Sequence, residues 1–184
     1  MDIQNSYRKI IEIMKNILEE IAARTRERIA KEKTCISVSE LENRIQEVNK
    51  NARQKITFLQ ALQKDGMSYI CEVKKASPSK GLIAPDFPYL AIAKEYEQAG
   101  ASAISCLTEP FYFQGADQYL REISAAVQIP VLRKDFTVDE YMIYQAKSLG
   151  ASAVLIICAI LDDGELRAYR PVSYTHLTLP TICS

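Results

Sequence analysis

Apolar residues recur at steps of three and four positions between Ile3 and Ile29, with charged residues between them. This spacing places the apolar side chains on one face of a long helix. The stripe fades after Ile21, which favours a helix that packs against a larger body over a coiled-coil dimerisation arm. The chain is therefore predicted to begin with an amphipathic helix.

Two shorter helical segments are predicted before the glycine at position 66. Ser39 and Glu42 have the spacing of a capping box, so a helix is predicted from about Glu40 to Lys50. A short helical turn is predicted near Phe58–Leu62. Residues 1–66 are accordingly interpreted as a helical extension.

After residue 66 the pattern changes to short β-type runs that alternate with helical patterns. The predicted strands are 69–74, 103–107, 130–134 and 153–160, and the predicted helices are 89–98, 118–127 and 139–149. Alternation of this kind is typical of an α/β fold with a parallel sheet. The segments GASAI at Gly100 and GASAV at Gly150 repeat the same step, in which a glycine closes a helix in the left-handed conformation and a strand follows.

Composition limits the classes of function. The 23 Lys and Arg residues balance 23 Asp and Glu residues, so no net charge attracts nucleic acid or an anionic membrane. No signal peptide and no apolar run long enough to span a bilayer is visible, which favours a cytoplasmic protein. The five cysteines form no C-x-x-C pair, so neither a metal site nor a disulfide framework is expected, and the cysteines within apolar runs are interpreted as buried free thiols.

Polar residues gather where the predicted strands end. Glu72 and Lys74 share one face of the first strand, Ser105 lies on the second, and Lys134 ends the third. In βα folds the carboxyl ends of the strands form the ligand-binding edge. Two lysines at this edge indicate an anionic substrate, and a positioned lysine could donate a proton to it. The alternative is a buried Lys–Glu pair that only fixes the strand.

The loops that follow these strands add two weaker signals. The segment ASPSKG offers hydroxyl and backbone N–H groups to a phosphate, and Gly81 would allow a close backbone approach. It lacks the spacing of a nucleotide P-loop. Several aromatic residues after the second and third strands, Phe111, Tyr112, Phe113 and Phe136, could stack on an aromatic ligand.

Four segments in order, EVKKASPSKG, GASAISCLTEPFYFQG, IPVLRKDF and GASAVLIICAIL, closely resemble the first four βα segments of the indole-3-glycerol-phosphate synthase family. The resemblance runs from about Ile56 to Leu161. It implies a (β/α)8 TIM barrel, of which the first four βα units are present. The earlier helical region resembles the N-terminal extension of that family more loosely.

The resemblance implies a lyase of tryptophan biosynthesis that closes the indole ring. Its substrate would be the phosphorylated, anthranilate-derived 1-(2-carboxyphenylamino)-1-deoxyribulose 5-phosphate, which loses carbon dioxide and water. By the same resemblance Lys134 matches the general acid, Lys74 a substrate-orienting lysine and Glu72 the neighbouring carboxylate. The matching substrate-binding positions are Ser77, near the phosphate, and Ser105, Phe113, Phe136 and Leu155, around the anthranilate ring. No metal or organic cofactor is implied.

The half-barrel that the resemblance implies is taken to end near residue 169. Residues 170–184 show neither helical nor strand patterning and read as a non-native tail, so His176 is given no catalytic role. The predicted division is 1–66, 67–169 and 170–184. A chain with four of eight strands is expected to be a fragment with little or no synthase activity, and its open sheet edges could cause self-association.

Two other functions remain open. One is a different phosphate-binding TIM-barrel enzyme, against which the pairing of Lys74 with Lys134 argues. The other is a non-catalytic interaction module, in which the first helix binds a partner through Ile10 and Met14.

Overall fold

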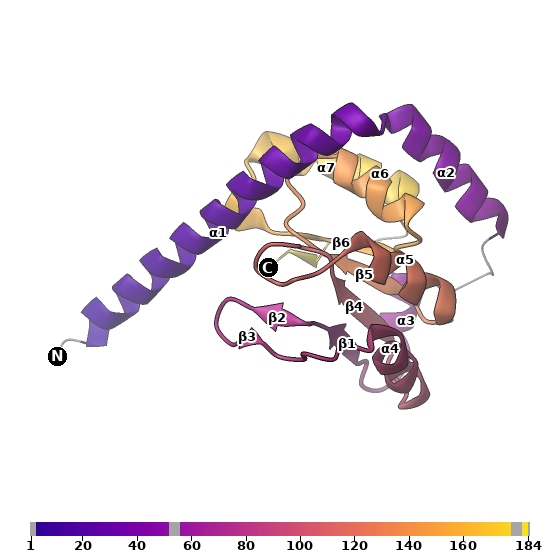
Figure 1. Ribbon diagram of the computed structural model, residues 1–184, viewed down its shortest axis with the longest axis horizontal. Coiled ribbons are helices and arrows are strands. Elements are labelled where there is room, and N and C mark those ends of the chain that lie inside the picture. Colours follow the sequence, from indigo (N-terminus) through magenta and orange to yellow (C-terminus); the bar gives the residue numbers. More distant parts are fainter. Residues whose placement is uncertain (1–2, 52–55, 178–181, 184) are drawn as a thin grey trace.

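Strands and helices alternate through most of the protein, preceded by three helices (Figure 1). The structure is a computed structural model. It describes the backbone of residues 3–51, 56–177 and 182–183, and the side chains of residues 17–50, 56–173 and 177. Ile10 and Met14 lie outside the described side chains.

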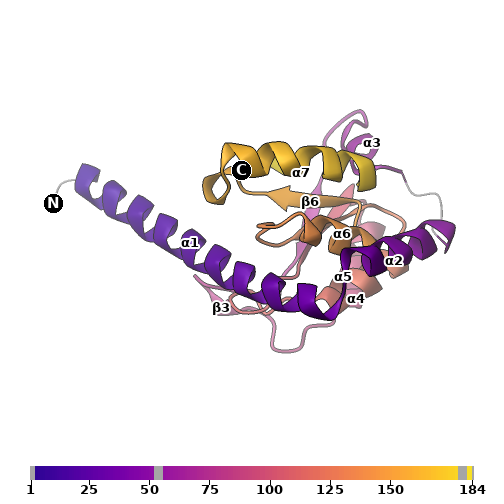
Figure 2. The ribbon, with the colours of Figure 1, turned by 90° about the horizontal axis from the view of Figure 1, so that it is seen from above.

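The first helix, α1 (Ile3–Cys35), is longer than predicted, and its N-terminal turns project away from the rest of the molecule (Figure 1). Figure 2 shows the same projection from above. Among the described side chains of α1, Ile21, Ala22 and Ile29 are each at most 2% exposed, so burial extends past the point at which the apolar stripe was expected to fade. Packing against a larger body is therefore confirmed for this part of α1: Ile17, Leu18 and Ile21 of the predicted stripe pack in one apolar cluster, and the contact continues to Ile29.

Helix α2 (Val38–Asn51) begins two residues earlier than predicted, because Ser37 rather than Ser39 accepts the capping hydrogen bond. The Glu40 N–H donates to Ser37 Oγ at 3.1 Å. Both serines are followed three positions later by glutamate, so spacing alone could not separate them. Helix α3 (Phe58–Leu62) matches its predicted range and carries a capping box from Thr57 and Gln60.

The strands form a parallel sheet in the order β1-β4-β5-β6-β7. Its members are β1 (Ile70–Val73), β4 (Ala103–Leu107), β5 (Val131–Lys134), β6 (Ala153–Ile156) and β7 (Ile182–Cys183). The intervening helices are α4 (Tyr89–Gln98), α5 (Asp117–Ala126), α6 (Tyr141–Ser148) and α7 (Asp163–His176). The predicted α/β alternation is confirmed, although the fourth strand ends at Ile156 and a 3-10 turn, η1 (Cys158–Ile160), replaces its expected continuation.

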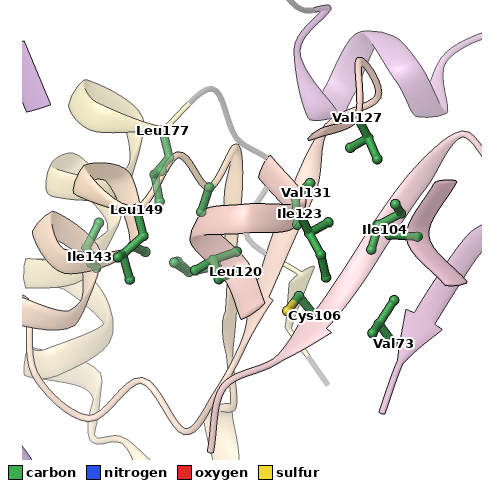
Figure 3. Packing of buried hydrophobic residues seen from close by; sticks show 14 of the residues in the cluster. Val73, Ile104, Cys106, Leu120, Ile123, Val127, Val131, Ile143, Leu149 and Leu177 are labelled. Atoms are coloured by element: carbon green, nitrogen blue, oxygen red, sulfur yellow. The ribbon is translucent and has the colours of Figure 1, made fainter. Parts of the chain in front are cut away.

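Alternate residues of the strands face two different layers. On one face Val73, Ile104, Cys106, Val131 and Val154 pack with helix residues in the main core (Figure 3). On the other face Ala103, Leu132 and Ala153 lie near the amino ends of the strands and enclose the Phe58 ring of α3. Helix α3 therefore closes the amino end of the inner face, which leaves the carboxyl end for a site.

Two glycines close helices as predicted. Gly100 follows α4 with φ of +91°, and Gly150 follows α6 with φ of +88°. Residues with a side chain rarely adopt this left-handed backbone conformation, so the repeated GASA segment marks the same helix-to-strand step twice.

The expectation that residues after 169 would be neither helix nor strand was wrong. Helix α7 continues to His176, and Ile182–Cys183 pairs in parallel with β6. Tyr169, Ser173 and Leu177 are buried at intervals of four residues, so one face of α7 does pack on the core. Pro171 lies inside this helix without ending it. The interpretation of residues 170–184 as a non-native tail stays a prediction.

The cysteines differ partly from the prediction. Cys106 is a buried free thiol, and burial raises its pKa to about 12. Cys71 is free and half-buried, whereas Cys158 is disulfide-bonded, against the expectation of a free thiol. Within the described part of the chain, no helix is both long enough and apolar enough to cross a membrane.

Candidate active site

The site residues expected on β1, β4, β5 and β6 fall into two rows across the inner face of the sheet. Strand pairing aligns Glu72 with Ser105, Ser105 with Leu132, and Leu132 with Ala153. The row nearer the carboxyl ends pairs Leu107 with Lys134. Strand alternation extends that row to Lys74 and Leu155 on either side.

Lys74 and Lys134 therefore lie in the same row, with β4 between them. Neighbouring strands are about 4.8 Å apart, so the two backbones are separated by about 10 Å. Both side chains are partly exposed at the carboxyl end of the sheet. A small anionic molecule above β4 could contact both ammonium groups.

The two lysines differ in their partners. Lys74 Nζ donates to Glu72 Oε1 at 2.5 Å, in a pair whose side chains are 33% and 29% exposed. Among the described residues no hydrogen bond or ion pair is made by the Lys134 ammonium, while its backbone oxygen accepts from the Thr108 N–H at 3.1 Å. Lys134 thus has a fixed backbone and an ammonium that is available to a ligand.

Ser105 brings an unpaired hydroxyl to the inner face. The residue is 5% exposed, and its buried Oγ has no hydrogen-bond partner among the residues that the structure describes. An unpaired buried polar group of this kind destabilises a fold by about 1–3 kcal/mol. A ligand on the inner face could supply the missing partner.

Replacing Ser105 with alanine is expected to leave the free energy of unfolding within about 1 kcal/mol of its present value, or to raise it, because no protein hydrogen bond is lost. Thr108→Val is the matched control, since the Thr108 hydroxyl donates to Asp135 Oδ2 at 2.8 Å and accepts from Arg133 Nε at 3.0 Å. That variant is expected to lose about 1–3 kcal/mol. Urea unfolding of both variants makes the comparison, and an equal loss in both would show that Ser105 is paired in solution.

The expected aromatic residues lie together only in part. The rings of Phe113 and Phe136 have centroids 6.4 Å apart, and both belong to an apolar cluster with Leu155 and Ile21 of α1. Phe111 instead is 49% exposed and lies under the Arg24 guanidinium, 4.8 Å from its ring centroid. Phe113, Phe136 and Leu155 are thus brought together beside the lysine row, whereas Phe111 belongs to the surface.

Ser77 lies in a small hairpin between β1 and α4. Strands β2 (Ala76–Ser77) and β3 (Gly81–Leu82) pair antiparallel, and Ser77 Oγ accepts from the Lys80 N–H at 3.3 Å. Gly81 adopts φ of +62°, and a Cβ added there would meet nothing within 4 Å. The positive φ explains the glycine in the turn, and the close approach of a phosphate to its backbone stays a prediction.

Glu109 is a buried carboxylate at the polar end of β4, and no role was assigned to it from the sequence. It follows β4, is 0% exposed, and accepts hydrogen bonds from the backbone N–H groups of Phe111, Tyr112 and Phe113 at 2.7–3.0 Å. Gly115 closes the same loop, where an added Cβ would lie 2.5 Å from the Leu107 oxygen. The sequence TEPFYFQG therefore encodes a rigid loop that positions Phe113.

Asp135 is a second buried acid at the end of a strand, directly after Lys134, and no role was assigned to it from the sequence. Its side chain is fully buried and contacts Arg28 at 2.9 Å and Arg133 at 3.4 Å. Burial by itself would raise the pKa of Asp135, but the two guanidinium charges and the hydrogen bonds from Arg28 and Thr108 outweigh burial and lower it. Asp135 is therefore a buried carboxylate held between cations.

Comparison with known proteins identifies the family that this chain matches. Residues 18–176 match the family model described as indole-3-glycerol phosphate synthase. The indole-3-glycerol phosphate synthase of Lacticaseibacillus paracasei is 52% identical over 157 residues, which are 85% of this chain and 60% of that protein. The synthase of Ruminiclostridium cellulolyticum is 51% identical over 158 residues, with the same coverage of 85% and 60%.

The chain thus spans about 60% of the length of the curated relatives it matches. Within that span it has four consecutive βα units, β1-α4, β4-α5, β5-α6 and β6-α7, in one parallel sheet, as in part of a TIM barrel. The family match, the identity of about half of the aligned residues and this architecture together show that the chain belongs to the indole-3-glycerol phosphate synthase family.

Proposed function

We propose that the carboxyl end of this sheet is the acid-catalytic half of an indole-3-glycerol phosphate synthase site. The observation that carries the proposal is the row containing Lys74 and Lys134, in which one ammonium is paired with a carboxylate and the other is available. The substrate would be 1-(2-carboxyphenylamino)-1-deoxyribulose 5-phosphate.

The chemistry suits the positions of these side chains. As the aromatic carbon that bears the carboxylate attacks the ketone carbon, Lys134 would protonate the ketone oxygen. The carboxylate then leaves as carbon dioxide, and its bonding electrons return to the ring. The new hydroxyl then takes up a proton and departs as water, and the neighbouring ring CH2 carbon loses a proton, so that the double bond of the indole forms. Lys74, held by Glu72, would orient the substrate carboxylate through its positive charge.

The remaining contacts follow from the same end of the sheet. Phe113, Phe136 and Leu155 offer an apolar wall to the anthranilate ring, and the unpaired Ser105 hydroxyl lies one row below the lysines. The hairpin that contains Ser77 offers a hydroxyl and backbone N–H groups to the phosphate. No metal or organic cofactor is required for this reaction, which we place in the cytoplasm.

Synthase activity should depend on strands beyond the four described βα units, because a TIM-barrel site takes residues from the ends of several strands. We expect the 184-residue chain to turn over at least about 10²-fold more slowly than a chimera that continues after Leu161 with the corresponding later part of the Lacticaseibacillus paracasei relative. Formation of the product is measured through the fluorescence of its indole ring. Equal activity of the two proteins would contradict the expectation, and a well-folded but inactive chimera would contradict the proposed function.

The same 184-residue chain is expected to self-associate. Strand β1 is an edge of the described sheet, and Met67, Tyr69 and Ile70 beside it are 77%, 57% and 40% exposed. Exposed strand edges with apolar side chains favour pairing between molecules. Sedimentation velocity should show dimers or larger species that Ile70→Lys reduces, whereas a monodisperse monomer at all concentrations would contradict this expectation.

A further inference from the structure

A buried ionic cluster joins α1 to the strand that carries Lys134. Its members are Arg28 of α1, Arg133 of β5, Asp135 directly after β5, and Asp117 of α5. Arg28 and Asp135 are 107 positions apart in the sequence, and their side chains are 12% and 0% exposed. Removing one member of such a cluster leaves an uncompensated charge in the interior, so its geometry is strongly constrained.

In the sequence Asp135 lies between the site residues Lys134 and Phe136, and its carboxylate is linked to the backbone of both. Its Oδ1 accepts from the Phe136 N–H at 2.9 Å, which fixes the backbone of the residue that contributes a ring to the apolar wall. Its Oδ2 accepts from Arg28 Nη2 at 2.9 Å and from the Thr108 hydroxyl at 2.8 Å. The Thr108 N–H in turn binds the Lys134 carbonyl at 3.1 Å.

These contacts act on Lys134 from the opposite side of the strand. Asp135 lies just after the end of β5, and its Oδ2 is 3.4 Å from Nη2 of Arg133, so both side chains lie on the same side of the chain. Lys134 lies between these two residues, and a fixed Asp135 therefore restricts the direction in which the Lys134 side chain leaves the backbone. The Lys134 ammonium itself makes no hydrogen bond or ion pair within the part of the chain that the structure describes. Its position is therefore set through the backbone, and the backbone is held by Asp135.

We propose that Arg28 and Asp135 are positioning residues: α1 holds Lys134 in its productive direction through the Arg28–Asp135 ion pair. The inference rests on the proposed function of Lys134, because it explains how the extension of the fold contributes to that site without touching the reacting atoms. A group displaced by about 1 Å can lose about 10²-fold in rate, so a rigid connection of this kind matters for catalysis.

The test measures the reactivity of the Lys134 amine, without substrate, in the full 184-residue chain. The amine of Lys134 is acylated at several pH values, and its labelling rate is measured by peptide mass spectrometry, with Lys94 on α4 as the internal reference. Arg28→Met removes the ion pair but keeps an apolar stem. Arg28→Lys keeps the charge. Lys33→Met is the matched control, because Lys33 also joins α1 to the segment after β5, through an exposed ion pair with Asp139 at 2.7 Å.

In the Arg28→Met variant the labelling rate of Lys134 is expected to rise by about threefold or more over the pH range, with no change at Lys94. Arg28→Lys should restore most of the original profile, and Lys33→Met should leave it unchanged. An unchanged Lys134 profile in a folded Arg28→Met protein overturns the proposal, as does an equal rise in Lys33→Met. If Arg28→Met does not fold, Arg28→Gln carries the same expectation, since it removes the ion pair with Asp135 but keeps a polar side chain that can donate a hydrogen bond.

These outcomes are independent of turnover. A synthase assay that fails in the chimera would overturn the proposed function and leave the labelling result intact. An active chimera with an unchanged labelling profile would overturn the positioning role alone.

Discussion

Replacing Asp135 with alanine is expected to lower the free energy of unfolding by about 3–5 kcal/mol, because Arg28 and Arg133 would keep buried charges without their shared counterion. The Arg133 side chain is 1% exposed, so water cannot replace the carboxylate. Urea unfolding followed by circular dichroism measures the change. A loss below about 1 kcal/mol would show that the cluster rearranges at little cost.

Glu40→Ala serves as the control for this substitution. Glu40 forms an ion pair with Arg44 four residues later on α2, but both side chains are more than 40% exposed. Solvent screens such a pair, and its loss should change the free energy of unfolding by no more than about 1 kcal/mol. The contrast separates the effect of burial from that of removing an acid.

The same carboxylate predicts the pH dependence of stability. Because Arg133 and Arg28 hold the pKa of Asp135 below its usual range despite burial, the unfolded chain takes up this proton before the folded chain does. The stabilising contribution is therefore complete above the ordinary aspartate pKa of about 3.9 and is lost as the pH falls through the lower folded value. Asp135→Asn should lack this part of the acid dependence in pH-dependent unfolding curves.

Replacing Lys134 with methionine in the active chimera is expected to lower kcat/KM by about 10²–10⁴-fold, because methionine keeps much of the side-chain volume but cannot donate a proton. The fold should be preserved, since the Lys134 ammonium makes no ion pair or hydrogen bond in the described structure. Steady-state kinetics and circular dichroism check the two expectations together.

Lys94→Met is the control for Lys134→Met. Lys94 is exposed on α4, on the outer side of the sheet, and its loss should leave kcat/KM unchanged. A loss of less than about tenfold in Lys134→Met would assign the proton transfer to another group. Lys74 is the alternative donor, since it lies in the same row and is held by Glu72.

Local patterns predicted most elements after residue 66 closely. The ends of strands β4 and β5 and of helices α4, α5 and α6 are within two residues of the predicted ends. The reason is that the spacing of the apolar residues in each segment matches the face that the element buries. The predicted ends of helices were wrong where two local signals were equally strong, or where packing against the core outweighed a local signal. Ser37 and Ser39 offer the same capping spacing, and Pro171 stands inside a helix whose buried face includes Tyr169 and Ser173.

The candidate site was predicted in part. Strand alternation and the common carboxyl edge of parallel strands suffice to place Glu72, Lys74, Ser105 and Lys134 on one face. The carboxyl edge also includes Glu109, but neither signal predicts that its carboxylate is buried and accepts from three backbone N–H groups of its own loop. A buried acid directly before a proline and three aromatic residues was the available sign, but an isolated glutamate in a loop is usually solvated.

The sequence by itself determined the order of strands and helices, the family and the edge of the sheet at which the polar side chains meet, because each follows from periodicity, motif or strand direction along a short stretch. Only the tertiary structure decided that α1 packs through Ile21–Ile29 and that Arg28 meets Asp135. A local pattern records which face of an element is buried, but not which distant side chain covers it. A pair 107 residues apart therefore becomes visible only when the fold brings its members together.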